Sequence, residues 1–170
     1  MNKSIHPIVL AISSGILMTL AWPPLPTAFI LPFALIPLLL AILNTQAKRV
    51  HLARWWYAVI GLFIFNLGTT WWVWNASNEG ALMAFFANSL IMALVFYAFH
   101  LTKKHVGNKE GYISLLIYWI AFEHFHYNWE SSWPWLNFGN VFSITPTWIQ
   151  WYSYTGVLGG TLWVLILNLL

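Results

Sequence analysis

Six apolar stretches, separated by short segments that carry proline or charge, account for most of the chain. An α-helix needs about 20 apolar residues to cross a bilayer, and each stretch approaches that length. The pattern predicts an all-α fold, a polytopic membrane helix bundle that forms one transmembrane domain over 1–170. The spans are predicted at 8–22, 27–43, 55–74, 81–101, 111–125 and 149–170, with an outer loop at 126–147.

Prolines predict where the first two spans end or bend. Pro23, Pro24 and Pro26 follow the first apolar stretch, and proline ends a helix because it lacks an N–H group and clashes with the preceding turn. Pro32 and Pro37 lie inside the second stretch, where a membrane helix tolerates them. We therefore expect the chain to turn between these two spans.

The basic side chains predict the orientation of the bundle, because lysine and arginine collect in cytoplasmic loops. With the N-terminus in the cytoplasm, all seven lie on the cytoplasmic side: Lys3, Lys48, Arg49, Arg54, Lys103, Lys104 and Lys109. The loop at 126–147 then faces the opposite side of a multi-pass membrane protein.

The composition agrees with the spans and excludes several classes of protein. Of the 170 residues, 60% are hydrophobic and 6% are charged, whereas a soluble domain carries about 25% charged residues. This excludes an ordinary soluble enzyme, a disordered protein and a nucleic-acid-binding protein. The chain has no cysteine, so these residues contain no disulfide, thiolate metal site or thiol nucleophile.

Tryptophan is concentrated at the predicted outer side, while only Trp55 and Trp56 mark the inner boundary. Aromatic belts ordinarily occur at both interfaces. The asymmetry leaves two interpretations open, a strong outer anchor or an outer-leaflet surface that handles lipid chains. The outer tryptophans are Trp22, Trp71, Trp72, Trp74, Trp129, Trp133, Trp135, Trp148 and Trp151.

Polar residues at the end of the fifth span are the candidates for chemistry. If the helix continues past Phe125, residues Glu123, His126, Tyr127 and Glu130 share one face. Three interpretations are open: a metal site with Glu and His ligands, a Glu–His acid–base pair, or a hydrogen-bonded cluster that fixes the outer loop. We expect the last of these, with no metal, no cofactor and no catalytic residue in this chain.

The segment that follows predicts a rigid aromatic turn. Pro134 restricts the backbone between Trp133 and Trp135, whose rings can lie at the level of lipid headgroups. The Asn137 amide can bind a polar headgroup or the loop's own backbone. We expect these four residues, with Glu123, His126 and Glu130, to contact lipid or to orient the loop.

These residues resemble a known family. Glu123, followed by a polar loop into Ser132-Trp133-Pro134-Trp135-Leu136-Asn137-Phe138-Gly139, is similar to the membrane portion of bacterial apolipoprotein N-acyltransferases. The segments 15–24, 61–74 and 146–160 resemble other parts of that portion in the same order. His126 stands where many members carry Arg, and Ser132-Trp133 where they carry Gly-Phe. Both departures resemble a Bacteroidota-type branch.

The resemblance implies a function and a location. The family transfers an acyl chain from a phospholipid, through a cysteine thioester, to the α-amine of a diacylglyceryl-modified apolipoprotein in the bacterial inner membrane. Its active side faces the periplasm, and a nitrilase-like domain with the reactive cysteine follows the membrane portion. That domain is not in this chain, so we expect these residues to be inactive alone and to belong to a longer acyltransferase.

One alternative comes from a different class of protein. Six spans and a tryptophan-rich outer side also suit the substrate-binding membrane component of a vitamin uptake transporter, which would pair with an ATPase. The Trp-Pro-Trp-Leu-Asn loop and the absence of a basic residue at the end of the last span argue against it.

Overall fold

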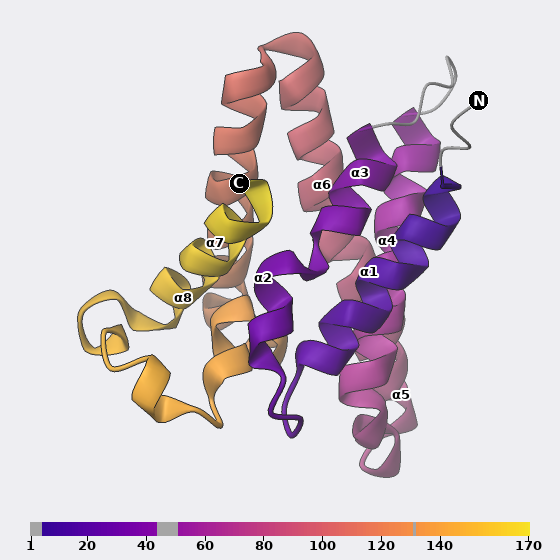
Figure 1. The fold of residues 1–170 in the computed structure, drawn as a ribbon. Helices are drawn as coiled ribbons and strands as arrows, with labels where there is room; N and C mark the ends of the chain where they lie inside the picture. The colour runs from indigo at the N-terminus through magenta and orange to yellow at the C-terminus, as the bar shows by residue number, and fades with distance from the viewer. Residues whose placement is uncertain (1–4, 44–50, 131) are drawn as a thin grey trace.

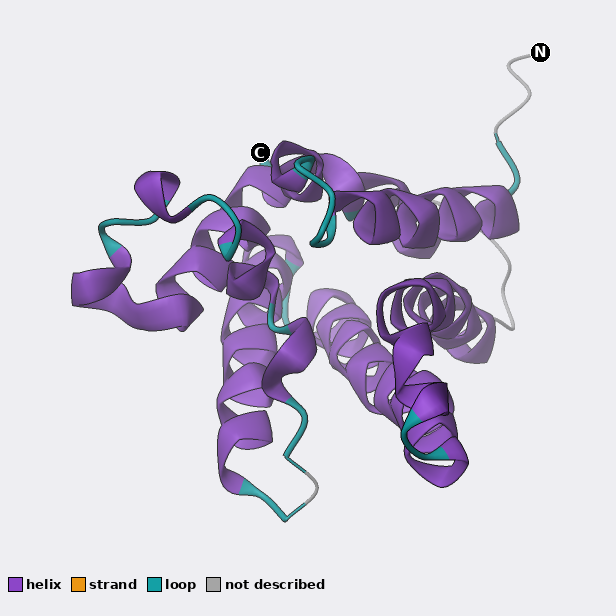
Figure 2. Cartoon of the chain, turned by 90° about the horizontal axis from the view of Figure 1, so that it is seen from below, coloured by secondary structure: helices purple, strands orange, loops and turns teal. Residues whose placement is uncertain are grey.

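The computed structural model describes residues 5–43, 51–130 and 132–170, and all regular elements in these ranges are helical (Figure 2). The prediction of an all-α fold is confirmed. Three of the seven basic residues that predict the orientation, Lys3, Lys48 and Arg49, lie outside the described residues.

The helices α1 (Pro7–Ala21), α4 (His51–Thr70), α6 (Asn88–His105) and α7 (Asn108–Asn128) form the body of the bundle and run side by side along its long axis (Figure 1). The turn between α6 and α7 lies at the same end as the start of α1, whereas the turn that follows α1 and the helix α5 (Asn78–Leu82) lie at the opposite end. The elements of the first half are α1 (Pro7–Ala21), η1 (Ala28–Ile30), α2 (Leu31–Ala34), α3 (Ile36–Leu43), α4 (His51–Thr70) and η2 (Trp71–Asn75). Those of the second half are α5 (Asn78–Leu82), the π-helical turn η3 (Met83–Ala87), α6 (Asn88–His105), α7 (Asn108–Asn128), the 3₁₀ turns η4 (Pro134–Leu136), η5 (Phe138–Phe142) and η6 (Pro146–Trp148), and α8 (Tyr152–Leu169).

Within the described residues, two helices are long and apolar enough to cross a membrane, judged by length and composition alone: Leu52–Asn75 and Asn78–His105. Two shorter apolar helices, Pro7–Ala21 and Ala28–Leu43, accompany them. The number of spans and the multi-pass topology stay predictions.

The second predicted span is helical but broken between α2 and α3, close to Pro37, whose nitrogen carries no hydrogen to donate to the helix. A side chain from α8 binds beside this break. The Leu35 amide donates to Asn168 Oδ1 (2.9 Å), and Asn168 Nδ2 donates to the Leu31 carbonyl (3.0 Å). The Asn168 carboxamide therefore ties α8 to α2.

The predicted bounds of the last two spans are corrected by the structure. The helix α7 extends three residues past the predicted end at 125, so 126–128 are helical and not part of the loop. The last helix begins at Tyr152 and not at 149, because η6 and a turn precede it. Within α8 the backbone breaks at Gly156 (φ 65°, ψ −174°), a conformation that glycine adopts readily.

Small residues allow α1 and α4 to approach closely. A Cβ atom on Gly15 would collide with the Gly61 carbonyl, and one on Gly61 would lie 2.9 Å from the Ala11 carbonyl. This is the close backbone contact that small residues permit between membrane helices. A polar link joins α4 to α6, since Asn88 Nδ2 donates to Asn66 Oδ1 (2.7 Å) and both residues are buried.

Candidate functional site

The buried carboxylate of Glu123, five residues before the end of α7, is the centre of the candidate site. The side chain is 1% exposed and its oxygens accept three hydrogen bonds. Trp119 Nε1 donates to Oε1 (2.9 Å), as does the Phe138 amide (2.8 Å). Thr161 Oγ1 donates to Oε2 (2.6 Å). A buried carboxylate needs such donors, because burial without them costs several kcal/mol.

These bonds tie three parts of the chain together. Phe138 belongs to η5 and Thr161 to α8, so the Glu123 side chain on α7 joins the loop to the next helix. The Thr161 hydroxyl also accepts from the Gly139 amide (2.9 Å), and the Tyr152 hydroxyl donates to the Gly139 carbonyl (2.9 Å). Both backbone polar groups of Gly139 are therefore bound by side chains of α8.

The loop also packs tightly against its neighbours. A Cβ atom on Gly139 would overlap the carbonyl oxygen of Val157, so glycine allows η5 to approach α8. The Phe138 ring stacks on the Trp119 ring with centroids 4.6 Å apart and an interplanar angle of 17°. The segment 138–139 is thus held by stacking, close backbone contact and hydrogen bonds together.

The four polar residues expected on one helix face do not converge. His126 is buried, but Tyr127 is 42% exposed, and Glu130 is exposed and lies beyond the end of α7 at Asn128. The helix ends because the backbone of Trp129 is extended (φ −108°, ψ 164°), so the seven-residue periodicity no longer applies at Glu130. The described residues contain no group of three His, Cys, Asp or Glu side chains that could hold a metal.

The arrangement also lacks the geometry of a Glu–His acid–base pair. The Glu123 oxygens bond to Trp119, Phe138 and Thr161, while neither ring nitrogen of His126 has a hydrogen-bond partner. A histidine is cationic only below its pKa, about 6.5 when unperturbed, so His126 is not the fixed cation that an arginine would be.

The predicted aromatic turn is the 3₁₀ turn η4, and its residues have different environments. Trp135 is 59% exposed, and its ring lies edge-to-face against Trp72 with centroids 6.2 Å apart. Trp133 is half-buried, and Asn137 is buried with its Nδ2 unpaired. Asn140 Nδ2 donates to the Pro134 carbonyl (2.9 Å), which closes the turn.

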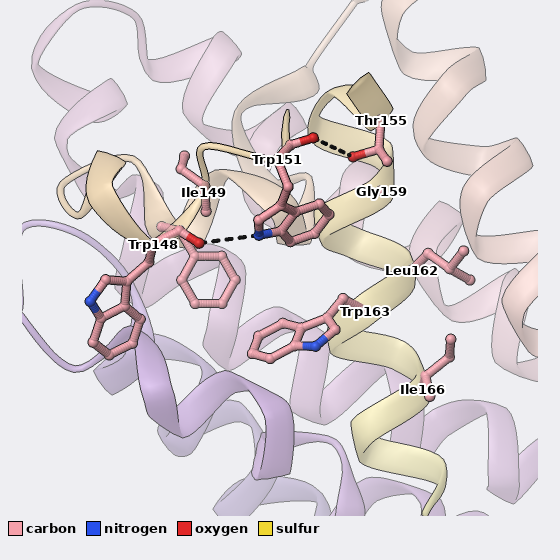
Figure 3. A pocket seen from close by; sticks show the side chains of 9 residues that line it. Trp148, Ile149, Trp151, Thr155, Gly159, Leu162, Trp163 and Ile166 are labelled. Atoms are coloured by element: carbon pink, nitrogen blue, oxygen red, sulfur yellow. Dashed lines mark hydrogen bonds between the residues drawn. The ribbon is translucent and has the colours of Figure 1, made fainter. Parts of the chain in front are cut away.

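An apolar cavity of about 490 Å³ lies beside this loop, between η6 and α8 (Figure 3). Its few polar contacts are local, since Trp151 Nε1 donates to the Trp148 carbonyl (3.1 Å). The walls are aromatic and aliphatic, and such walls suit a hydrocarbon chain. The lining residues are Phe142, Trp148, Ile149, Trp151, Thr155, Gly159, Leu162, Trp163 and Ile166.

Three residues at the centre of the site were not among the predicted site residues. Trp119 lies one helical turn before Glu123, so the i, i+4 spacing alone could have identified it. Thr161 and Tyr152 lie 38 and 29 residues after Glu123, in another helix, and no local pattern in the sequence indicates that they meet it.

Comparisons with known proteins agree with the sequence resemblance. A family model described as the apolipoprotein N-acyltransferase N-terminal domain matches residues 14–170. Apolipoprotein N-acyltransferase from Chlorobaculum tepidum is 28% identical over 167 residues, which cover 96% of this chain and 31% of that protein. The chain thus spans about a third of the length of this relative. No solved structure matches the chain.

Proposed function

Because the chain belongs to the family of apolipoprotein N-acyltransferase N-terminal domains, we propose that it is the membrane portion of a lipoprotein N-acyltransferase. The whole enzyme would take an acyl chain from a phospholipid and transfer it to the α-amine of a diacylglyceryl-cysteine. These 170 residues contain no cysteine, so a thioester intermediate would form on a residue outside them. The vitamin-transporter alternative has no support in the comparisons.

The observation that carries this proposal is the loop that Glu123 holds. Its carboxylate binds the Phe138 amide and the Thr161 hydroxyl, which supports a positioning role for Glu123 and not a chemical one. The loop then presents Trp135 at the surface, 59% exposed. An exposed indole at the membrane interface is suited to contact lipid near its headgroup.

The cavity between η6 and α8 supports a path for acyl chains. It is lined by the tryptophans Trp148, Trp151 and Trp163, and it lies next to the loop. We propose that the protein is multi-pass in the bacterial inner membrane, and that the loop held by Glu123 and this cavity guide lipid toward the reactive centre. Six spans with a cytoplasmic N-terminus would place the loop and the cavity on the periplasmic side.

Substitution of Trp135 in the full-length gene product tests this proposal. We expect Trp135→Ala to lower the rate of lipoprotein N-acylation about tenfold, equivalent to ~1.4 kcal/mol in the transition state, because an aromatic contact with lipid is lost. The readout is the mass of the N-terminal lipopeptide, followed over time in cells that depend on this gene.

Trp71→Ala is the matched control, because Trp71 is 60% exposed and belongs to η2, outside the loop. It should leave the rate within about twofold, the range of a neutral surface substitution. Equal rates in the two variants would reject a specific role for the loop. Absence of any N-acylation by the unaltered protein would reject the proposed function.

A further inference from the structure

A second, smaller cavity of about 200 Å³ lies between the α5–η3–α6 helix and the end of α7. Most of its wall is apolar, but four buried or half-buried polar side chains also line it. The lining residues are Gly80, Met83, Ala84, Ala87, Asn88, Ile91, His126, Trp129, Glu130, Ser132 and Trp133.

Unpaired polar atoms are concentrated around this cavity. In the described part of the chain, five buried side-chain nitrogen and oxygen atoms without a partner belong to residues that line it. Leaving a buried polar group unpaired is costly, which is why the large majority are paired in native proteins. These five are Asn88 Oδ1, His126 Nδ1, His126 Nε2, Trp129 Nε1 and Trp133 Nε1. Asn88 is 6% exposed and His126 is 2% exposed.

The backbone at the cavity is also irregular. Met83, Ala84 and Ala87 line it, and all three belong to the π-helical turn η3 inside an otherwise α-helical run from 78 to 105. Single π turns are rare, and they occur frequently at functional sites. The apolar segment 83–87 contains no proline or glycine that would explain the irregular turn. The irregular turn and the unpaired atoms therefore mark the same place independently.

The atoms define the kind of ligand that fits. An indole N–H only donates, a neutral imidazole donates once and accepts once, and Asn88 Oδ1 accepts. No lysine or arginine lines the cavity, and its one charged residue is the exposed Glu130. This lining disfavours a phosphate. It suits an uncharged group with carbonyl oxygens that is attached to hydrocarbon.

We propose that this cavity binds the glycerol ester neck of a lipid, with ester carbonyls accepting from Trp129 Nε1 and Trp133 Nε1. The inference rests on the proposed function, which supplies two lipids with such a neck. These are the phospholipid donor and the diacylglyceryl-cysteine acceptor. Only the acceptor carries a peptide N–H next to the neck, a donor that matches Asn88 Oδ1.

Native mass spectrometry of the purified full-length gene product tests the assignment. The probes are a dioctanoylglyceryl-cysteine peptide and dioctanoylphosphatidylethanolamine, each compared with an ether analogue that lacks the carbonyls. We expect the ester form to bind about three- to tenfold more tightly than the ether form, the effect of one net hydrogen bond. The lipid that shows this preference is the one that the cavity takes.

Conservative variants assign the preference to this cavity. Trp129→Phe and Trp133→Phe keep an aromatic ring but remove the N–H group, so each should lower the ester preference to about twofold or less. Trp71→Phe makes the same change outside the cavity and should leave the preference intact. Equal binding of ester and ether forms by the unaltered protein overturns the assignment, as does a preference that survives both cavity substitutions.

The two proposals fail separately. N-acylation of a lipopeptide is measured in the same preparations. An intact ester preference without acylation would overturn the proposed function and leave the cavity assignment standing. Acylation without an ester preference would overturn the cavity assignment alone.

Discussion

At the scale of single residues, Thr161 contributes more to the loop than its size indicates. Its hydroxyl donates to the Glu123 carboxylate and accepts from the Gly139 amide, so one oxygen atom joins the helix α7 to η5 through α8. All three residues are buried. Removing the hydroxyl would leave a carboxylate oxygen and an amide hydrogen without partners, and water has no access to replace it.

We therefore expect Thr161→Val to lower the free energy of unfolding by about 1–3 kcal/mol, the cost of unpaired buried polar groups. Valine has nearly the same shape as threonine, so the packing volume is kept. The measurement is the thermal unfolding midpoint of the detergent-purified protein.

Thr69→Val is the control for this substitution. The Thr69 hydroxyl donates to the Phe65 carbonyl one turn earlier in its own helix (2.7 Å), a local bond that adds little to stability. Its midpoint should stay close to that of the unaltered protein. Similar losses in both variants would show that the Glu123 cluster does not stabilise the fold beyond an ordinary helix bond.

At the scale of elements, the junction between α2 and α3 is bound by a side chain that lies 133 residues after Leu35 in the sequence. Asn168 bonds to the Leu31 carbonyl, the Leu35 amide and the Val164 carbonyl. The first two groups belong to the second apolar stretch and the third to α8. The Asn168 side chain therefore holds α8 against the α2–α3 junction.

Asn168→Leu should destabilise this junction by about 1–3 kcal/mol, because the Leu31 carbonyl and the Leu35 amide lose their bonds to the Asn168 side chain. Hydrogen exchange of the Leu35 amide should also become faster. The control is Asn128→Leu, since exposed Asn128 bonds only to the His124 carbonyl at the end of α7. A Leu35 amide that remains equally protected in Asn168→Leu would contradict the proposed role of the carboxamide.

The same elements show what the sequence could predict. The lengths of the apolar stretches and the prolines Pro23 and Pro24 located the first helices and their turn, because both signals are local. The contact of Asn168 with Leu31 spans 137 residues and follows from tertiary packing alone. The π turn at 83–87 also had no signal, since that segment contains only good helix formers and phenylalanine.

The candidate site was predicted in the same partial way. Glu123 and the turn around Pro134 were identified from charge and aromatic residues in an apolar context. The separation of His126 from Glu130 was missed, because it depends on where α7 ends. That end is set by the extended backbone at Trp129 and not by a proline or glycine.

At the scale of the whole molecule, the bundle has two chemically different ends. Lys103, Lys104 and Lys109 flank the turn between α6 and α7, which lies at the same end as the start of α1 (Figure 1). The opposite end holds the η2–α5 turn, where Trp72 and Trp74 are exposed. Basic residues favour the cytoplasmic side of a membrane, so the end with the lysines should face the cytoplasm.

Cysteine labelling can test this orientation, because these 170 residues contain no cysteine of their own. The signal of each variant is taken as the labelling above that of the unaltered full-length gene product, whose proposed thioester cysteine lies outside these residues. Val106→Cys and Ala76→Cys place exposed thiols in the α6–α7 turn and the η2–α5 turn, at opposite ends of the bundle. In intact cells with a permeabilised outer membrane, a membrane-impermeant maleimide should label Ala76→Cys. It should label Val106→Cys only after the inner membrane is opened. Lysine at the α6–α7 turn resists translocation, which is the physical reason for the difference.

The reverse labelling pattern would mean that the bundle has the opposite orientation. The loop held by Glu123 would then lie in the cytoplasm, where it could not receive lipid from the periplasmic leaflet. Equal labelling of both positions before the inner membrane is opened would mean that the helices α1, α4, α6 and α7 do not separate the two turns across a membrane.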